Sequence, residues 1–270
     1  MSIPKGKKSY SIQGSSASSV VEGTAFEYNE DALRDSIEKK VKDIVFDTEG
    51  KKSLSDLLIT GDKTDFEMKR IGEVLENSVE GVEPWRIGEA LAEAYLSSHN
   101  YCFFPWPDGR DERKRGSSLP GADLVGFVGN KDSFKFAFGE IKTTGEQKYP
   151  PGPMYGKKGL KKQIEDLKDS ESIRNDLFKY LGFRAENSSW ENKFKIAAVK
   201  YLNDSRAISL YGVLIRDVSP HHDDLRVRIE KLDQTTSSPM SINLLAIYLP
   251  KGSIESLPAL LEKSSKEEDE

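Results

Sequence analysis

The chain has 270 residues, of which 36% are hydrophobic and 31% charged, with a formal net charge of −5 at pH 7. This length suffices for one large domain, or for a core domain with a smaller appendage. The acidic balance argues against a surface coated with positive charge for non-specific nucleic-acid binding, but it leaves room for a local basic groove. No stretch reaches the roughly 18 to 20 apolar residues that span a bilayer, so we expect no membrane segment.

Cys102 is the single cysteine, which excludes an internal disulfide and a cysteine-based zinc cluster. The N-terminus, Met1 to Lys8, carries basic residues, but no apolar segment follows them as it would in a secretory signal. We therefore expect a protein of the reducing cytoplasm.

Residues 1–82 are expected to form a mainly helical N-terminal region. Apolar residues recur there at helical spacing, with charged residues on the opposite face. The expected elements are a short strand over Ser9–Gln13 and helices over Glu30–Phe46, Lys52–Ile59 and Asp65–Ser78.

Residues 83–250 are expected to form the core, in which strands and helices alternate. The expected helices cover Arg86–Ser98, Leu160–Leu181 with a break near Asp169–Ser170, and 221–232. The expected strands cover Asn100–Pro107, Ala122–Val128, Ser133–Lys142, Phe194–Leu202, Ile208–Ile215 and Ile242–Leu249. A last helix over Ser253–Lys263 and an acidic tail occupy residues 251–270. This pattern predicts a mixed α/β (α+β) fold.

The strand ending at Lys142 holds the residues that suggest chemistry. Side chains alternate between the faces of a strand, so Glu140 and Lys142 continue the face that carries Phe134, Phe136 and Phe138. Charged groups at the end of a buried face need a partner. The preceding strand, across a tight turn at residues 129–132, supplies Asp123 near its start. Both carboxylates are therefore expected at one end of an antiparallel hairpin.

Two carboxylates and a backbone carbonyl, that of Ile141, would supply the hard oxygen ligands that Mg²⁺ prefers, with Mn²⁺ as a substitute. Such an ion polarises a phosphodiester oxygen and lowers the pKa of bound water. Lys142 would orient or help deprotonate the attacking water and stabilise negative charge in the transition state. We therefore predict Asp123, Glu140 and Lys142 as catalytic residues.

The motifs Pro120-Gly-Ala-Asp123 and Gly139-Glu-Ile-Lys142 resemble those of the PD-(D/E)XK nuclease superfamily, although Gly-Ala is inserted in the first. The resemblance implies a restriction-endonuclease-like mixed sheet flanked by helices. It also implies a metal-binding glutamate on the helix before the hairpin, which is Glu89, with Glu93 as an alternative on the same helix face. A polar residue on the helix after the hairpin, Gln163, is implied as a further catalytic residue.

A narrower resemblance depends on four runs: Trp85–Leu91, Phe104–Pro107 with Arg110 and Asp111, Ser118–Phe127, and Phe138–Thr143. With these runs, residues 83–182 resemble the HamA family, the nuclease subunits of Hachiman anti-phage defence systems. That resemblance implies a DNA-degrading effector with a helicase partner of the HamB kind. We expect DNA contacts from basic residues on both sides of the motifs: Arg113, Arg115, Lys157, Lys158 and Lys161. The alternatives are a stand-alone restriction endonuclease and a catalytically silent nuclease fold that serves as a binding or assembly module.

One other cluster, His221-His222-Asp223-Asp224, could suggest a metal site. Adjacent residues of one segment do not easily face one ion together. We therefore interpret the cluster as a loop or helix start in which an aspartate forms the cap.

Overall fold

The computed structural model describes residues 2–15, 18–59, 61, 63–76, 80–107, 110 and 121–266. These residues build a seven-stranded mixed sheet in the order β1-β2-β7-β6-β5-β4-β3, which confirms the expected α/β class. The strands are β1 (Lys7–Gln13), β2 (Val21–Glu27), β3 (Cys102–Phe103), β4 (Leu124–Asn130), β5 (Ser133–Thr144), β6 (Ile208–Arg216) and β7 (Ser241–Tyr248).

Strand direction divides the sheet into three parts. The central strands β5, β6, β7 and β2 run parallel to one another, whereas β4 and β3 continue antiparallel at one edge and β1 does so at the other. All nine residues of β6 are buried, as is typical of a parallel strand covered on both faces.

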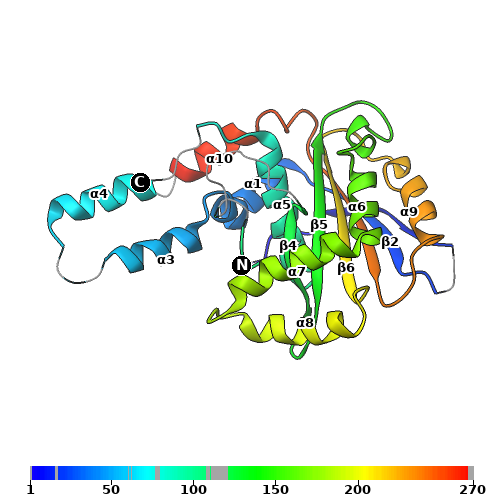
Figure 1. The fold of residues 1–270 in the computed structure, drawn as a ribbon. Coiled ribbons are helices and arrows are strands. Elements are labelled where there is room, and N and C mark those ends of the chain that lie inside the picture. Colours follow the sequence, from blue (N-terminus) through cyan, green and yellow to red (C-terminus); the bar gives the residue numbers. More distant parts are fainter. Residues whose placement is uncertain are drawn as a thin grey trace.

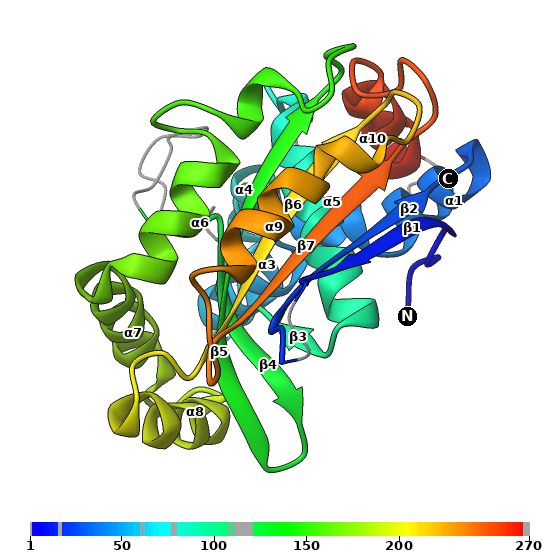
Figure 2. The ribbon, with the colours of Figure 1, turned by 90° about the vertical axis from the view of Figure 1, so that its right-hand side faces the viewer.

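Helices cover both faces of the sheet (Figures 1 and 2). On one face lie α1 (Glu30–Ser36), a π-helical turn (Ile37–Val41), α2 (Lys42–Val45), α5 (Pro84–His99) and α10 (Leu257–Lys266). On the other lie α6 (Leu160–Asp169), α7 (Glu171–Ala185), α8 (Glu191–Asn203) and α9 (Arg226–Asp233). Each face has its own apolar core, so β5 is packed between two hydrophobic layers.

The hairpin of β4 and β5 forms as the sequence predicted. Leu124 pairs with Gly139, and the register continues to Asn130 opposite Ser133. Phe134, Phe136 and Phe138 all enter the core beneath α6, α7 and α8. The alternation of side chains therefore directs Glu140 and Lys142 to the same face.

The prediction of a strand over Phe194–Leu202 was wrong, because these residues belong to helix α8. Ala197, Ala198 and Tyr201 are buried at helical spacing, whereas Val199 and Leu202 are 63% and 74% exposed. The aromatic and β-branched content suggested a strand, but the burial follows the helical period.

Strand β2 was not predicted, and it brings the N-terminal part of the chain into the sheet. It pairs with β7 in parallel, with Val21 opposite Ile242. Residues 1–82, expected to be mainly helical, thus contribute two strands. The expected strand over Asn100–Pro107 is reduced to Cys102–Phe103.

Helices α3 (Thr48–Leu58) and α4 (Asp65–Leu75) extend together away from the sheet (Figure 1). No residue of either helix is buried among those the structure describes. Their exposed large apolar side chains, with Ile59 after α3, are Leu54, Leu57, Leu58, Ile59, Phe66, Met68 and Val74. No helix within the described part of the chain is long and apolar enough to cross a membrane.

Candidate active site

Strand β5 positions two of the predicted catalytic side chains. Its parallel neighbour β6 fixes Glu140 opposite Gly212 and Lys142 opposite Leu214. Asp123 lies in the bend directly before β4, whose first residue is paired with Gly139. The hairpin therefore brings all three side chains to the same end of the sheet.

Lys142 lies between the two carboxylates. Its Nζ is 3.8 Å from Asp123 Oδ2 and 3.6 Å from Glu140 Oε2. The same Asp123 oxygen accepts a hydrogen bond of 2.7 Å from the backbone N–H of Ile141. The three side chains thus form one polar group at the end of two otherwise apolar strands.

The Glu140 side chain is almost completely buried, with 1% of its surface exposed. Neither of its oxygens has a hydrogen-bond partner among the described residues. Burial, and then the nearby Asp123 carboxylate, raise the pKa of Glu140 to about 9, while Lys142 acts in the opposite direction. The ammonium group of Lys142 therefore does not balance the charge of both carboxylates, since Asp123 and Glu140 lie close together and Glu140 is buried.

These groups fit a divalent cation that prefers oxygen. Asp123 and Glu140 supply carboxylate oxygens. The N–H of Ile141 points to Asp123, and in a strand the carbonyl of a residue points to the same side as its N–H. Strand β4 begins opposite Gly139 and does not extend to Ile141. The Ile141 carbonyl is therefore directed to the side on which Asp123 lies.

Glu89, on α5, shares a small pocket of about 60 Å³ with Asp123, and Glu93 also lines it. The close approach of α5 to β5 depends on Gly88. A Cβ built on Gly88 would lie 2.0 Å from Thr143 Oγ1, so only glycine allows the helix to pack this closely. Glu89, the next residue along α5, lines the pocket together with Asp123, near the end of β5 that carries Glu140 and Lys142.

Gln163, on α6, lies on the opposite face of the sheet. It lines a pocket of about 490 Å³ together with Glu140. Its Oε1 is buried and has no hydrogen-bond partner among the described residues. The helices before and after the hairpin thus each bring one predicted residue to a pocket that is also lined by Asp123 or Glu140.

Two of the predicted DNA-binding lysines, Lys157 and Lys158, are exposed in the turn before α6, and Lys161 is half-buried in its first turn. The carboxylate of Glu146 holds the preceding loop by accepting a hydrogen bond of 2.7 Å from the N–H of Gly152. Arg113 and Arg115 lie outside the described residues.

A series of aromatic and cationic side chains was not predicted. The Arg184 guanidinium lies 3.8 Å from the centre of the Tyr180 ring and 5.4 Å from that of Trp106. Arg110 is 5.0 Å from the same Trp106 ring and donates two hydrogen bonds of 2.6 Å to Asp47. Two pairs of residues four apart, Tyr180 with Arg184 and Trp106 with Arg110, come from distant segments, so no local sequence pattern connects one pair with the other.

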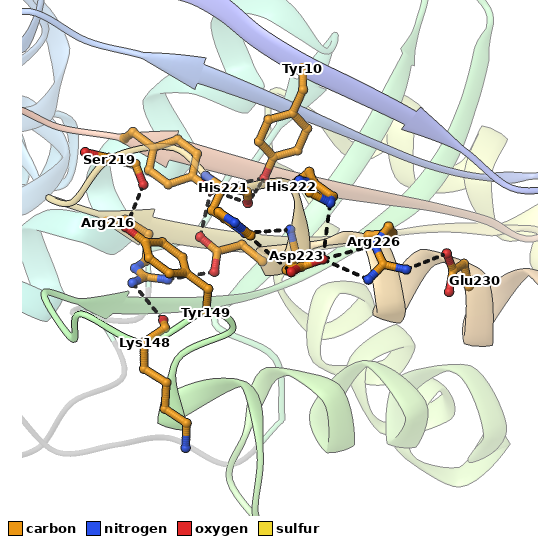
Figure 3. Close-up of polar contacts among 12 residues, drawn as sticks. Tyr10, Lys148, Tyr149, Arg216, Ser219, His221, His222, Asp223, Arg226 and Glu230 are labelled. Atoms are coloured by element: carbon orange, nitrogen blue, oxygen red, sulfur yellow. Dashed lines mark hydrogen bonds and ion pairs between the residues drawn. The ribbon is translucent and has the colours of Figure 1, made fainter.

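The histidine cluster forms a 3₁₀ turn at the start of α9 (Figure 3). The prediction of an aspartate cap was wrong, since Nδ1 of His221 accepts the backbone N–H of Asp223 at 3.3 Å. Arg226 donates two hydrogen bonds, of 3.0 and 2.9 Å, to the Asp223 carboxylate. Potential ligand atoms of His221, His222 and Asp223 lie within 4.8 Å of one another. These side chains therefore converge, although adjacent residues of one segment were not expected to face one ion together.

Beneath this turn, Arg216 and Asp224 form an ion pair of 2.8 Å in which neither side chain is exposed. Arg216 also donates to the carbonyl oxygens of Glu146 and Lys148. It therefore ties the loop after β5 to the turn before α9 (Figure 3).

Asp123, Glu140 and Lys142 thus meet at one end of the hairpin, with Glu89 on one side of the sheet and Gln163 on the other. No model of a known protein family matches the chain, and no curated protein matches it significantly.

Proposed function

We propose that this protein is a Mg²⁺-dependent nuclease that hydrolyses phosphodiester bonds of DNA at Asp123, Glu140 and Lys142. One observation carries the proposal. The carboxylate of Glu140 is buried without a hydrogen-bond partner among the described residues, beside a second carboxylate and a lysine. Ionisation of the buried Glu140 carboxyl is unfavourable and is offset only in part by Lys142, 3.6 Å away, so a further cation is the group that this arrangement favours.

Asp123, Glu140 and the Ile141 carbonyl would hold the ion, and Glu89 would contribute from α5. When bound, Mg²⁺ polarises a phosphodiester oxygen and makes bound water more acidic. Asp123 is held in place by the N–H of Ile141, and Glu140 by the surrounding core. Lys142 reaches both carboxylates, and from there its ammonium group would donate to the attacking water or to an oxygen of the phosphate.

DNA as the substrate is supported by the exposed Lys157 and Lys158 in the turn before α6. The sequence resemblance to HamA extends the proposal to an effector subunit of an anti-phage defence complex with a helicase partner. The exposed apolar side chains of α3 and α4 are compatible with such a protein partner.

The test is cleavage of plasmid and linear DNA by the purified protein, with Mg²⁺, Mn²⁺ or EDTA, with and without the product of a neighbouring helicase gene. Glu140→Gln and Lys142→Met are compared with Glu73→Gln and Lys195→Met, which replace exposed members of surface ion pairs. We expect metal-dependent cleavage by the wild type and both controls, and a loss of at least about a hundredfold in the two site variants. Equal cleavage by all five proteins would disprove the site, and no cleavage under any condition would disprove the activity.

A further inference from the structure

The pocket of about 490 Å³ beside Glu140 has the size of a ligand-binding site. It lies between the β4–β5 hairpin and the helices α6 and α7. Pockets that bind small organic ligands typically measure roughly 300 to 1,000 Å³. The catalytic end of β5 thus opens onto a space much larger than a metal ion and its water molecules need.

The lining of this pocket is apolar and rich in hydrogen-bond acceptors. Val125, Leu167, Ile173 and Leu177 form its apolar part, and Tyr180 adds an aromatic ring. Gln163 adds a buried Oε1 without a partner among the described residues.

Two carboxylates, those of Asp166 and Asp176, also line the pocket, each paired with a lysine of its own helix. No lysine or arginine that the structure describes lines the pocket itself. This chemistry disfavours a phosphate group and favours a flat, apolar group that carries N–H donors.

We propose that this pocket binds an unpaired nucleobase next to the scissile phosphate, so that the substrate is single-stranded or locally unpaired DNA. The inference rests on the proposed nuclease function, which places a phosphodiester at Glu140. Nucleobases have an apolar face and present amino or imino N–H donors at their edges. The buried oxygen of Gln163 is the acceptor for such a donor.

The aromatic and cationic series described above supports a path for a single strand. Tyr180 lines the pocket of Glu140, and Trp106 lines the smaller pocket of Asp123. Arg184 lies against both rings and therefore connects the two sides of the catalytic group. Aromatic rings that stack on bases and cations that follow the backbone are the features by which proteins bind single strands.

The bases of an intact duplex cannot enter this pocket. Its bases are stacked and paired, and a base reaches a pocket only when it is unpaired or rotated out of the helix. We therefore expect ends, gaps and single strands to be bound in preference to intact duplex.

The test is equilibrium binding of labelled oligonucleotides to Glu140→Gln, which keeps the pocket but is expected not to cleave. The three probes are a single strand, the same single strand with abasic sites in place of its bases, and the corresponding duplex. We expect the normal single strand to bind at least about tenfold more tightly than either other probe. Equal affinity for the three probes would overturn the inference.

Two variants in the Glu140→Gln background test the pocket itself. Leu177→Trp fills it, and Tyr180→Ala removes its aromatic ring. Val199→Trp on exposed α8 is the control. Each pocket variant should lower single-strand affinity at least about fivefold and leave abasic binding unchanged. If Leu177→Trp does not fold, Tyr180→Ala and the abasic probe still test whether the pocket binds a base. If the protein prefers the normal single strand but the wild type does not cleave DNA, the proposed nuclease function is disproved. The inference that the pocket binds a base is then still supported.

Discussion

The carboxylate of Asp123 accepts a hydrogen bond from the backbone N–H of Ile141, with 2.7 Å between Oδ2 and N. This bond joins the first carboxylate to the strand that carries the second. Asp123 therefore has a structural contact in addition to the metal-binding role that we propose for it.

The two roles of Asp123 are separable by substitution. Asp123→Asn keeps an oxygen that accepts from Ile141, so its free energy of unfolding should stay within about 1 kcal/mol of the wild type. Asp123→Ala leaves that N–H without its partner and should destabilise the protein by about 1–3 kcal/mol. Urea unfolding measures both values, and both variants should lose cleavage. Equal stability of the two variants would show that the hydrogen bond has no structural role.

Replacement of Glu140 by glutamine should stabilise the metal-free protein. The pKa of Glu140 is raised from its ordinary 4.5 to about 9, so between these values the folded protein holds a proton that the unfolded chain has lost. The stability of the wild type should therefore fall as pH rises through this window, and this dependence should be weaker in Glu140→Gln.

Thermal unfolding in EDTA at pH 5, 7 and 8.5 measures this difference. The melting temperature of Glu140→Gln should exceed that of the wild type by at least about 2 °C at pH 8.5, and by less at pH 5. Glu73→Gln makes the same replacement at a side chain that is 46% exposed and is the control for the substitution itself. A constant difference across the three pH values would contradict the prediction.

Mg²⁺ and Mn²⁺ should stabilise the wild type, and more strongly at higher pH. Glu140 must release its proton to bind a cation, so the apparent affinity should increase with pH below about 9. A ligand at a hundred times its dissociation constant stabilises the folded state by about 2.7 kcal/mol. Thermal unfolding with and without the ions measures the effect. Glu140→Gln should show a clearly smaller shift, and an equal shift would place the ion elsewhere.

The core of the candidate site was predictable because it depends on local sequence. Glu140 and Lys142 follow from the alternation of one strand, and Asp123 follows from a hairpin with a short turn. The positions of Glu89 and Gln163 depend on how α5 and α6 pack on the sheet, which no periodicity specifies. They were expected only because of the family resemblance.

The errors in the predicted secondary structure also arise from packing between distant elements. Strand β2 contains small residues, Gly23 and Ala25, on the face toward α9, and its partner β7 lies more than 200 residues away. Helix α8 was taken for a strand because its composition favours β structure. Both features are determined by long-range packing, which overrides local preference.

The contact between α5 and β5 should be sensitive to a single methyl group. Gly88→Ala would force α5 away from Thr143, so we expect a loss of about 1–3 kcal/mol in stability and weaker metal binding through Glu89. Gly72→Ala on α4 is the matched control, since nothing lies within 4 Å of its added Cβ. The control should gain up to about 1 kcal/mol, because alanine favours helix. Chemical unfolding compares the two, and equal effects would exclude the packing argument.

The buried pair of Arg216 and Asp224 should contribute strongly to stability. Arg216→Met leaves a buried carboxylate without its ion-pair partner and should cost about 3–5 kcal/mol. Arg206→Met breaks the solvent-accessible pair with Asp204 and should change stability far less. Urea unfolding measures both. A small effect at Arg216 would indicate that water or rearrangement compensates for the lost pair.

The position of β7 between β2 and β6 has a consequence for biosynthesis. The hairpin of β1 and β2 is the first part of the sheet to leave the ribosome, but its parallel neighbour consists of residues 241–248. The hairpin therefore stays without that neighbour until residues 241–248 have been translated. Without residues 241–248 the hairpin of β1 and β2 has no contact with β6, so one edge of the sheet depends on segments that lie more than 200 residues apart.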